Sequence, residues 1–237
     1  MTAPAAVPPL LAADSITHRF GGRLVLDAAY VDVVAGTVTA LVGQSGAGKT
    51  TLLEILVGRR RPDAGQVRYA GTRVPRATRA ALARRGVAWV PDVPCLSRRE
   101  PLRRQLALVA RAWDTDPEAV TRAFGIAALL DRTTAALSTG ERRQCELALA
   151  AASHPDVLVI DEPFRDLEPL HREALGRRLR ELAAGGVAVL FADHDAVMVA
   201  QVADRLFSIE RGCTRLVPDF RTTPVPEWYR SWGTRTK

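Results

Sequence analysis

The most constraining stretch of this sequence is residues 43–50, Gly-Gln-Ser-Gly-Ala-Gly-Lys-Thr, which fits the phosphate-binding pattern G-x-x-x-x-G-K-[ST]. The apolar, β-branched residues 37–42 before it predict a buried strand, and residues 51–57 after it predict a helix. In that context the backbone N–H groups of the loop and of the helix N-terminus point toward an anion. The sequence therefore predicts a phosphate site between a strand and a helix.

Lysine usage supports this interpretation. The chain has 33 lysines and arginines, but its lysines are Lys49 and Lys237 alone. A compact ammonium fits inside a phosphate cradle where a planar guanidinium does not. We expect Lys49 to contact the β- and γ-phosphates of a nucleotide, and Thr50 to offer its hydroxyl to Mg²⁺.

Composition limits the number of domains, the partners and the cellular compartment that this chain can have. The 237 residues, 47% of them hydrophobic, suffice for one α/β domain with a sizeable core. The net charge of +7 leaves nucleic acid or an anionic membrane surface open as partners, although arginine in place of lysine also follows from genome base composition. Three widely spaced cysteines favour reduced thiols in a cytosolic protein. No apolar run reaches the roughly 18–20 residues of a membrane span, and residues 1–13 lack the charged start of a signal peptide. A role at a membrane would therefore need another chain to cross it.

Hydrophobic patterning divides the chain into three kinds of segment. Short strands precede the phosphate loop and indicate an antiparallel sheet, at residues 15–20, 23–26 and 29–34. Later strands alternate with helices and indicate a mainly parallel sheet with its chemistry at the carboxyl ends, at residues 86–90, 157–161, 187–192 and 205–209. Residues 92–137 predict a helical insertion, with helices at 102–113 and from Asp116 to about 124. We expect an α/β P-loop NTPase core with an antiparallel β subdomain and an inserted helical subdomain.

Acidic residues and a histidine follow two of the apolar strands. Asp161 ends the first, where a carboxylate can hold the shell of Mg²⁺, and Glu162 can polarise an attacking water as a general base. His194 follows the second, where a neutral imidazole can reach a γ-phosphate or that water. Each feature alone is often structural, but a phosphate loop in the same chain favours the catalytic interpretation.

With these residues collected, the chain resembles the ATP-binding subunits of ABC transporters over residues 11–217, leaving 218–237 as a C-terminal tail. The phosphate loop, the signature sequence at 137–141, the Asp161-Glu162 pair and His194 stand in the family's order and spacing. The resemblance implies ATP and Mg²⁺ as cofactors. It also implies a head-to-tail dimer, of this chain with itself or with a paralogue, that drives separate integral membrane permease subunits. The protein would then be cytoplasmic and peripheral on the inner face of the membrane.

The resemblance also implies roles for single residues. Glu162 would be the general base and His194 the sensor of the γ-phosphate, acting with Lys49, while Phe20 would stack on adenine rather than belong to the core. The expected ATP contacts are Gly43, Gln44, Ser45, Gly46, Ala47, Gly48, Lys49, Thr50 and Thr51 in one subunit, and Ser138, Thr139, Gly140 and Glu141 in the other. The expected metal ligands are Thr50, Asp161 and Asp92.

Three positions depart from the family pattern. Asp92 stands where the family usually has a glutamine that reaches Mg²⁺ and the water and relays the state of the site to the membrane subunits. Aspartate is shorter and anionic, but it can still bind Mg²⁺. Thr139 replaces the first glycine of the signature pair, and Glu168 replaces an aspartate in the loop that touches the opposite site across the dimer.

Two rival functions remain open at this stage. One is a soluble ABC-type ATPase that acts on nucleic acid or ribosomes, but such proteins usually carry two cassettes or a long coiled-coil insertion, so we do not expect nucleic acid as a partner. The other is a nucleotide-gated scaffold with weak turnover, which Asp92 suggests. The presence of Lys49, Asp161, Glu162 and His194 argues against this scaffold. Cargo, direction of transport and the role of the aromatic tail residues Trp228, Tyr229 and Trp232 stay open.

Overall fold

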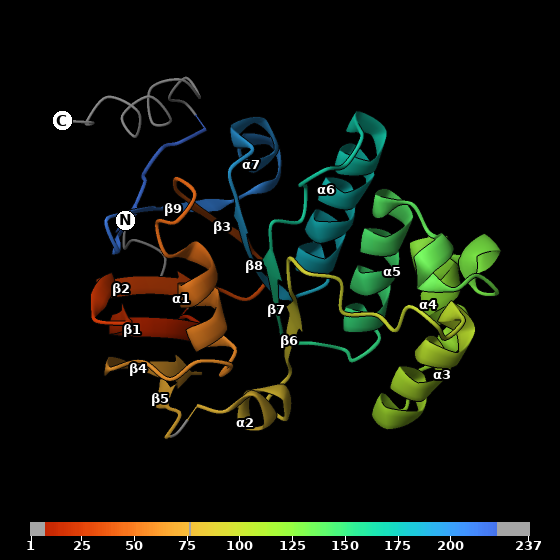
Figure 1. Ribbon diagram of the computed structural model, residues 1–237, viewed down its shortest axis with the longest axis horizontal. Helices are drawn as coiled ribbons and strands as arrows, with labels where there is room; N and C mark the ends of the chain where they lie inside the picture. The colour runs from red at the N-terminus through yellow and green to blue at the C-terminus, as the bar shows by residue number, and fades with distance from the viewer. Residues whose placement is uncertain (1–7, 76, 222–237) are drawn as a thin grey trace, which may run out of the picture.

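The fold consists of two sheets and the helices that cover them (Figure 1). The computed structural model describes residues 8–75 and 77–221. The antiparallel sheet has the order β2-β1-β4-β5, with β2 at Arg23–Val33, β1 at Leu11–Phe20, β4 at Ala64–Tyr69 and β5 at Thr72–Arg73. The second sheet has the order β10-β9-β3-β8-β7-β6, with β10 at Cys213–Leu216, β9 at Arg205–Glu210, β3 at Val38–Val42, β8 at Ala188–Asp193, β7 at Val157–Asp161 and β6 at Val87–Val90. The predicted antiparallel and mainly parallel sheets are both present.

Two details of the strand prediction were wrong. The strand predicted at residues 15–20 begins at Leu11, because residues 11–14 pair with β2 and β4. Residues 23–26 and 29–34 do not form two strands, because β2 is continuous and pairs with β1 from Phe20↔Arg23 to Leu11↔Val33. The apparent interruption at Asp27-Ala28 is absorbed by register shifts, with Ala28 in a left-handed conformation (φ 47°). Pairing along the neighbouring strand overrides the local sequence signal, which contains no information about the partner.

The parallel sheet is buried on both faces, and alternate residues of each strand enter different cores. In β7, Leu158 and Ile160 join one core, and Val157 and Val159 join the other. The first core is shared with helices α3 to α7, at Leu102–Trp113, Pro117–Phe124, Thr139–Ala151, Pro169–Ala184 and Ala196–Val202. The second is shared with the antiparallel sheet and with α1 (Lys49–Leu56) and α2 (Arg79–Ala83). The helix that follows the phosphate loop and the signature helix α5 therefore cover opposite faces of this sheet.

The region predicted as a helical insertion contains α3 and α4 and the short 3₁₀ turns Ala127–Leu129 and Thr134–Ala136. The predicted cap of α4 is present, since the Asp116 carboxylate accepts from the backbone N–H groups of Glu118 and Ala119. Both α3 and α4 contact α5, so the signature helix joins this helical layer to the core. Its outer limits stay a prediction.

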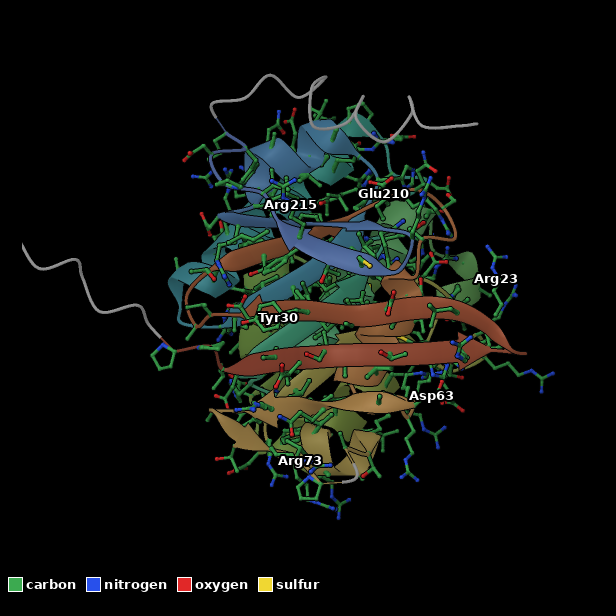
Figure 2. The ribbon with its side chains drawn as sticks, turned by 90° about the vertical axis from the view of Figure 1, so that its left-hand side faces the viewer. Arg23, Tyr30, Asp63, Arg73, Glu210 and Arg215 are labelled. Atoms are coloured by element: carbon green, nitrogen blue, oxygen red, sulfur yellow. The ribbon has the colours of Figure 1, made fainter. Side chains whose placement is uncertain are left out.

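The two sheets adjoin along β2 and β10, which lie side by side (Figure 2). The N–H of Tyr30 on β2 donates to the Thr214 hydroxyl of β10 at 2.6 Å. Nearby, Arg205 of β9 donates to the carbonyl oxygen of Asp32 at 3.0 Å, and its guanidinium is 2.8 Å from the Asp32 carboxylate. Polar contacts therefore tie the antiparallel sheet to the edge of the parallel one.

Of the C-terminal tail, residues 218–221 are described. Phe220 is buried in the first core, and Arg221 donates to the carbonyl oxygen of Ala203. Trp228, Tyr229 and Trp232 lie outside the described residues.

We predict that Asp32→Ala destabilises the fold by about 1–3 kcal/mol, because it leaves the half-buried Arg205 guanidinium without its carboxylate. Urea unfolding followed by circular dichroism measures the change. The matched control is Arg122→Ala, which removes an exposed ion pair on α4 and should shift stability by less than about 0.5 kcal/mol. Equal stability of the Asp32 variant and the wild type would show that this pair does not join the sheets.

Candidate functional site: a nucleotide-binding edge of the parallel sheet

The phosphate loop connects β3 to α1, as predicted. A Cβ added to Gly43 would lie 2.5 Å from the Ile209 carbonyl oxygen. A Cβ added to Gly48, which has a φ of 105°, would lie 2.9 Å from the Leu26 side chain. Both positions require glycine, because the neighbouring strands leave no room for a side chain. The pattern's glycines thus have a packing reason in this chain.

Lys49 lies at the start of α1 and is buried. Its ammonium donates to the carbonyl oxygens of Gly43 at 2.8 Å and Gln44 at 3.2 Å, so it folds over its own loop. Burial lowers the pKa of Lys49, an effect that the nearby Glu162, Asp161 and Asp193 oppose. The ammonium is therefore held inside the loop that the sequence assigns to phosphate.

Asp161 ends β7 and is 1% exposed. Within the described part of the chain, neither of its carboxylate oxygens has a hydrogen-bond partner. Burial raises the pKa of Asp161 to about 6; the adjacent Thr50 hydroxyl opposes this rise without reaching hydrogen-bond geometry, and Glu162 and Asp92 add to it. Buried carboxylate oxygens without partners beside a hydroxyl are the donor set of a hard cation. Asp161 and Thr50 therefore fit Mg²⁺.

Glu162 follows directly, in a left-handed conformation with a φ of 46°. Its backbone N–H donates to the Ala192 carbonyl oxygen at 2.8 Å, which fixes the turn against β8. Its carboxylate accepts from Arg165 at 2.9 Å, and His194 Nδ1 is 3.9 Å from its other oxygen. The structure brings the expected base and the expected phosphate sensor together at one sheet edge.

Sequence reasoning missed the residue that holds this arrangement. The fully buried Asp193 carboxylate accepts from the backbone N–H groups of His194 at 2.7 Å, Asp195 at 2.9 Å and Phe164 at 3.1 Å. Burial raises the pKa of Asp193, and these three donors oppose the rise. Asp193 thereby joins the loop after β7 to the loop after β8. Its position at the end of an apolar strand, before His194, was the available signal.

Asp92 lies in the loop after β6. Its carboxylate is 2.7 Å from Arg165, the same arginine that contacts Glu162. Arg165 was also missed, although its spacing of three residues from Glu162 was visible in the sequence. The metal role expected of Asp92 stays a prediction.

The signature residues begin α5. The Ser138 hydroxyl accepts from the Glu141 N–H, and the Glu141 carboxylate accepts from the Ser138 N–H, which is a capping box. The Ser138 N–H lowers the pKa of Glu141, and Arg132 adds to this effect. Ser138 and Thr139 are exposed, whereas Gly140 packs so closely that a Cβ would lie 2.7 Å from the His171 ring. The start of α5 is therefore well formed and accessible.

Arg143 connects this helix to the rest of the site and was not anticipated from the sequence. Its buried guanidinium donates to the carbonyl oxygens of Pro91, Asp161 and Glu162 and to the Glu146 carboxylate. It fixes α5 relative to the ends of β6 and β7.

Phe20, at the end of β1, is 60% exposed, so it is not a core residue. The Arg60 guanidinium lies 5.0 Å from the centre of its ring. An exposed aromatic ring is available for stacking, and its contact with adenine stays a prediction.

The family model for ABC transporters matches residues 26–165. The chain belongs to this family. It is 36% identical over 205 residues to the Nod factor export ATP-binding protein I of Burkholderia lata, covering 84% of this chain and 67% of that protein. It is also 36% identical over 211 residues to the zinc import ATP-binding protein ZnuC of Halorhodospira halophila, covering 88% and 76%. A solved ATP-binding subunit of an ABC transporter superposes with a TM-score of 0.82 at 25% identity, covering 95% of this chain and all of that one.

This chain is thus the ATP-binding and ATP-hydrolysing subunit of an ABC transporter, as the sequence predicted. Its relatives thus include both an export protein and an import protein at equal identity. Within residues 8–75 and 77–221, no helix has the length and apolarity needed to cross a membrane.

The pKa of Asp161 predicts how stability changes with pH when nucleotide and Mg²⁺ are absent. Because the folded value of about 6 exceeds the ordinary 3.8, the folded state binds the proton more tightly. Stability from this group is then lost as pH rises from about 4 through 6. At pH 7.5 we expect Asp161→Asn to be about 2–3 kcal/mol more stable than the wild type, and the difference to shrink toward pH 4.

Chemical unfolding of both proteins between pH 4 and pH 8 measures this difference. A constant difference across that range would contradict burial of an ionised Asp161. Asp116→Asn, at an exposed helix cap, is the control for a general effect of removing a carboxylate.

Proposed function

We propose that two copies of this chain, or this chain and a paralogue, bind two ATP molecules between them head to tail and drive permease subunits in the membrane. The observation that supports the dimer is the placement of the two helices that we expect to face phosphate, α1 after the phosphate loop and α5 at the signature. Helix α1 packs on β1, β2, β7 and β8, while α5 packs on β6, α3 and α4, across the parallel sheet (Figure 1). Ser138 and Thr139 are exposed there, and the N-terminus of a helix attracts anions. A second subunit would bring its own signature to the ATP held by this phosphate loop.

Within each site the roles follow from the contacts. Lys49 and the N–H groups of the phosphate loop bind and orient the β- and γ-phosphates. Thr50 and Asp161 would hold Mg²⁺, which neutralises charge on the phosphate oxygens when bound. Glu162 accepts a proton from the attacking water, and His194, close to Glu162, contacts the γ-phosphate. Asp193 keeps the two loops that carry these residues in place.

The membrane partnership is inferred from the relatives, whose names describe export and import. The loop after β6 is the segment of this chain that we assign to permease contact. It contains Asp92 and, next to it, Val93, an apolar side chain that is 65% exposed. Contact there would place the subunit on the inner face of the cell membrane.

We predict that Glu162→Gln lowers ATP turnover by at least about 100-fold, because glutamine cannot accept the proton. The same variant should form a dimer with ATP and Mg²⁺, measured by size-exclusion chromatography with light scattering. Glu162→Gln combined with Lys49→Ala is the control and should stay monomeric, since it lacks the phosphate contact. Unchanged turnover would refute Glu162 as the base, and a Glu162→Gln protein that remains monomeric with ATP would refute the shared site.

We further predict that ATPase activity responds to permease subunits and not to nucleic acid. Permease subunits that co-purify with this chain should change its turnover rate when they are reconstituted together in lipid vesicles. Val93→Asp should weaken this response without altering the turnover of the isolated subunit, because the charge opposes burial at the interface. Stimulation by RNA or DNA in place of permeases would favour the rival function.

A further inference from the structure

Arg165 joins two acidic residues that belong to different loops. One nitrogen of its guanidinium, Nη2, lies 2.7 Å from Asp92 after β6, and the other, Nη1, donates to Glu162 after β7 at 2.9 Å. The planar fork of arginine allows one side chain to engage two carboxylates at once. The resulting chain of contacts, Asp92–Arg165–Glu162, is called the acid bridge below.

The acid bridge lies where three segments of the chain meet. Asp92, Thr139 and Arg165 line one cavity of about 90 Å³, together with Pro94, Arg142, Arg143, Glu146 and Asp166. These residues come from the loop after β6, from the start of α5 and from the loop after β7. Asp166, a third carboxylate 3.6 Å from Arg165, is exposed and therefore contributes less. A displacement of the loop after β6 would act directly on Arg165.

The Glu162 side chain has few other constraints. Its backbone is fixed, because its N–H donates to Ala192 and its carbonyl accepts from Arg143. Its carboxylate, in contrast, is paired with Arg165, and His194 is beyond hydrogen-bond distance at 3.9 Å. Asp92, Asp161 and Glu162 also place three acids around one site. The Arg165 guanidinium offsets the repulsion between the Asp92 and Glu162 carboxylates, both of which it contacts.

We propose that Arg165 is a positioning residue that holds the Glu162 carboxylate for proton transfer, with Asp92 as its anchor. Asp92 then affects hydrolysis indirectly, because its carboxylate binds the Arg165 guanidinium and does not bind Mg²⁺. Because the loop after β6 carries Asp92, its movement on permease contact changes the placement of the base. The inference rests on the proposed role of Glu162 and identifies how that residue is kept in place.

The test is steady-state hydrolysis by the full chain with saturating Mg²⁺ and ATP. Arg165→Ala should lower kcat by about tenfold, a part of what a general base contributes, while KM for ATP changes less than about twofold. Arg165→Lys should recover part of the loss, since it keeps the charge but cannot span both carboxylates with separate nitrogens. Arg122→Ala removes an exposed arginine ion pair on α4 and should leave kcat unchanged.

A double-mutant cycle separates the acid bridge from a metal role for Asp92. Asp92→Asn alone should lower kcat, and adding it to Arg165→Ala should cause no further loss, because both changes break one chain of contacts. The Mg²⁺ concentration for half-maximal activity should be the same in all four proteins. Binding of a fluorescent ATP analogue and thermal melting show that each variant is folded and loads nucleotide.

Three results would overturn the inference. They are an unchanged or increased kcat in Arg165→Ala, a full multiplicative loss in the double variant, and a raised Mg²⁺ requirement in Asp92→Asn. The last result would assign Asp92 to the metal. These results are distinct from failure of the proposed function. If Glu162 is not the general base, Glu162→Gln keeps wild-type turnover, and Arg165 then has no base to position.

Discussion

Asp161 ends β7 in the interior of the protein, with carboxylate oxygens that have no hydrogen-bond partner in the described chain. Burying a carboxylate without a partner is costly, which is why its pKa rises to about 6. The rest of the site is arranged around this charge. The Lys49 ammonium lies near the Asp161 and Glu162 carboxylates, and Thr50 offers a hydroxyl to Asp161. Arg143 donates to the carbonyl oxygens of Asp161 and Glu162 and so fixes their backbone. A cation bound at this position would offset that cost.

The parallel sheet makes that arrangement possible. Its strands are buried on both faces, so they are rigid, and their carboxyl ends bring the phosphate loop, Asp161 and Asp193 to one edge. Asp193 joins the loops after β7 and β8 with three hydrogen bonds, so the backbones that carry Glu162 and His194 are held together. The residues that we propose as catalytic are thus held on loops by a buried scaffold.

The same sheet separates the phosphate loop from the signature. Helices α1 and α5 pack into different cores, and α5 is connected to the edge of the sheet through Arg143 and to α3 and α4 through apolar contacts. This division is the physical basis for our proposal that a second subunit supplies the signature to the ATP on this phosphate loop. It also leaves the loop after β6 between the helical layer and the catalytic edge, where Asp92 and Arg165 meet.

The sequence by itself determined the parts of this protein that depend on local pattern. The apolar strand before Asp161 and the cap at Asp116 are local patterns, and the glycine spacing of the phosphate loop and the order of motifs can be read without knowing any tertiary contact. They were sufficient to predict the α/β core, the helices of residues 102–113 and 116–124, and an ATPase of this family.

Tertiary structure decided what depends on residues distant in the chain. The continuity of β2 is set by its partner β1, because strand pairing is not encoded in one strand. Arg165 could have contacted any nearby acid, and only the packing of the loop after β6 against that after β7 brings it to both Asp92 and Glu162. Packing between distant segments also sets the direction of the Arg143 guanidinium and the burial of Asp161. Local sequence selects the chemical groups, and long-range packing selects their partners.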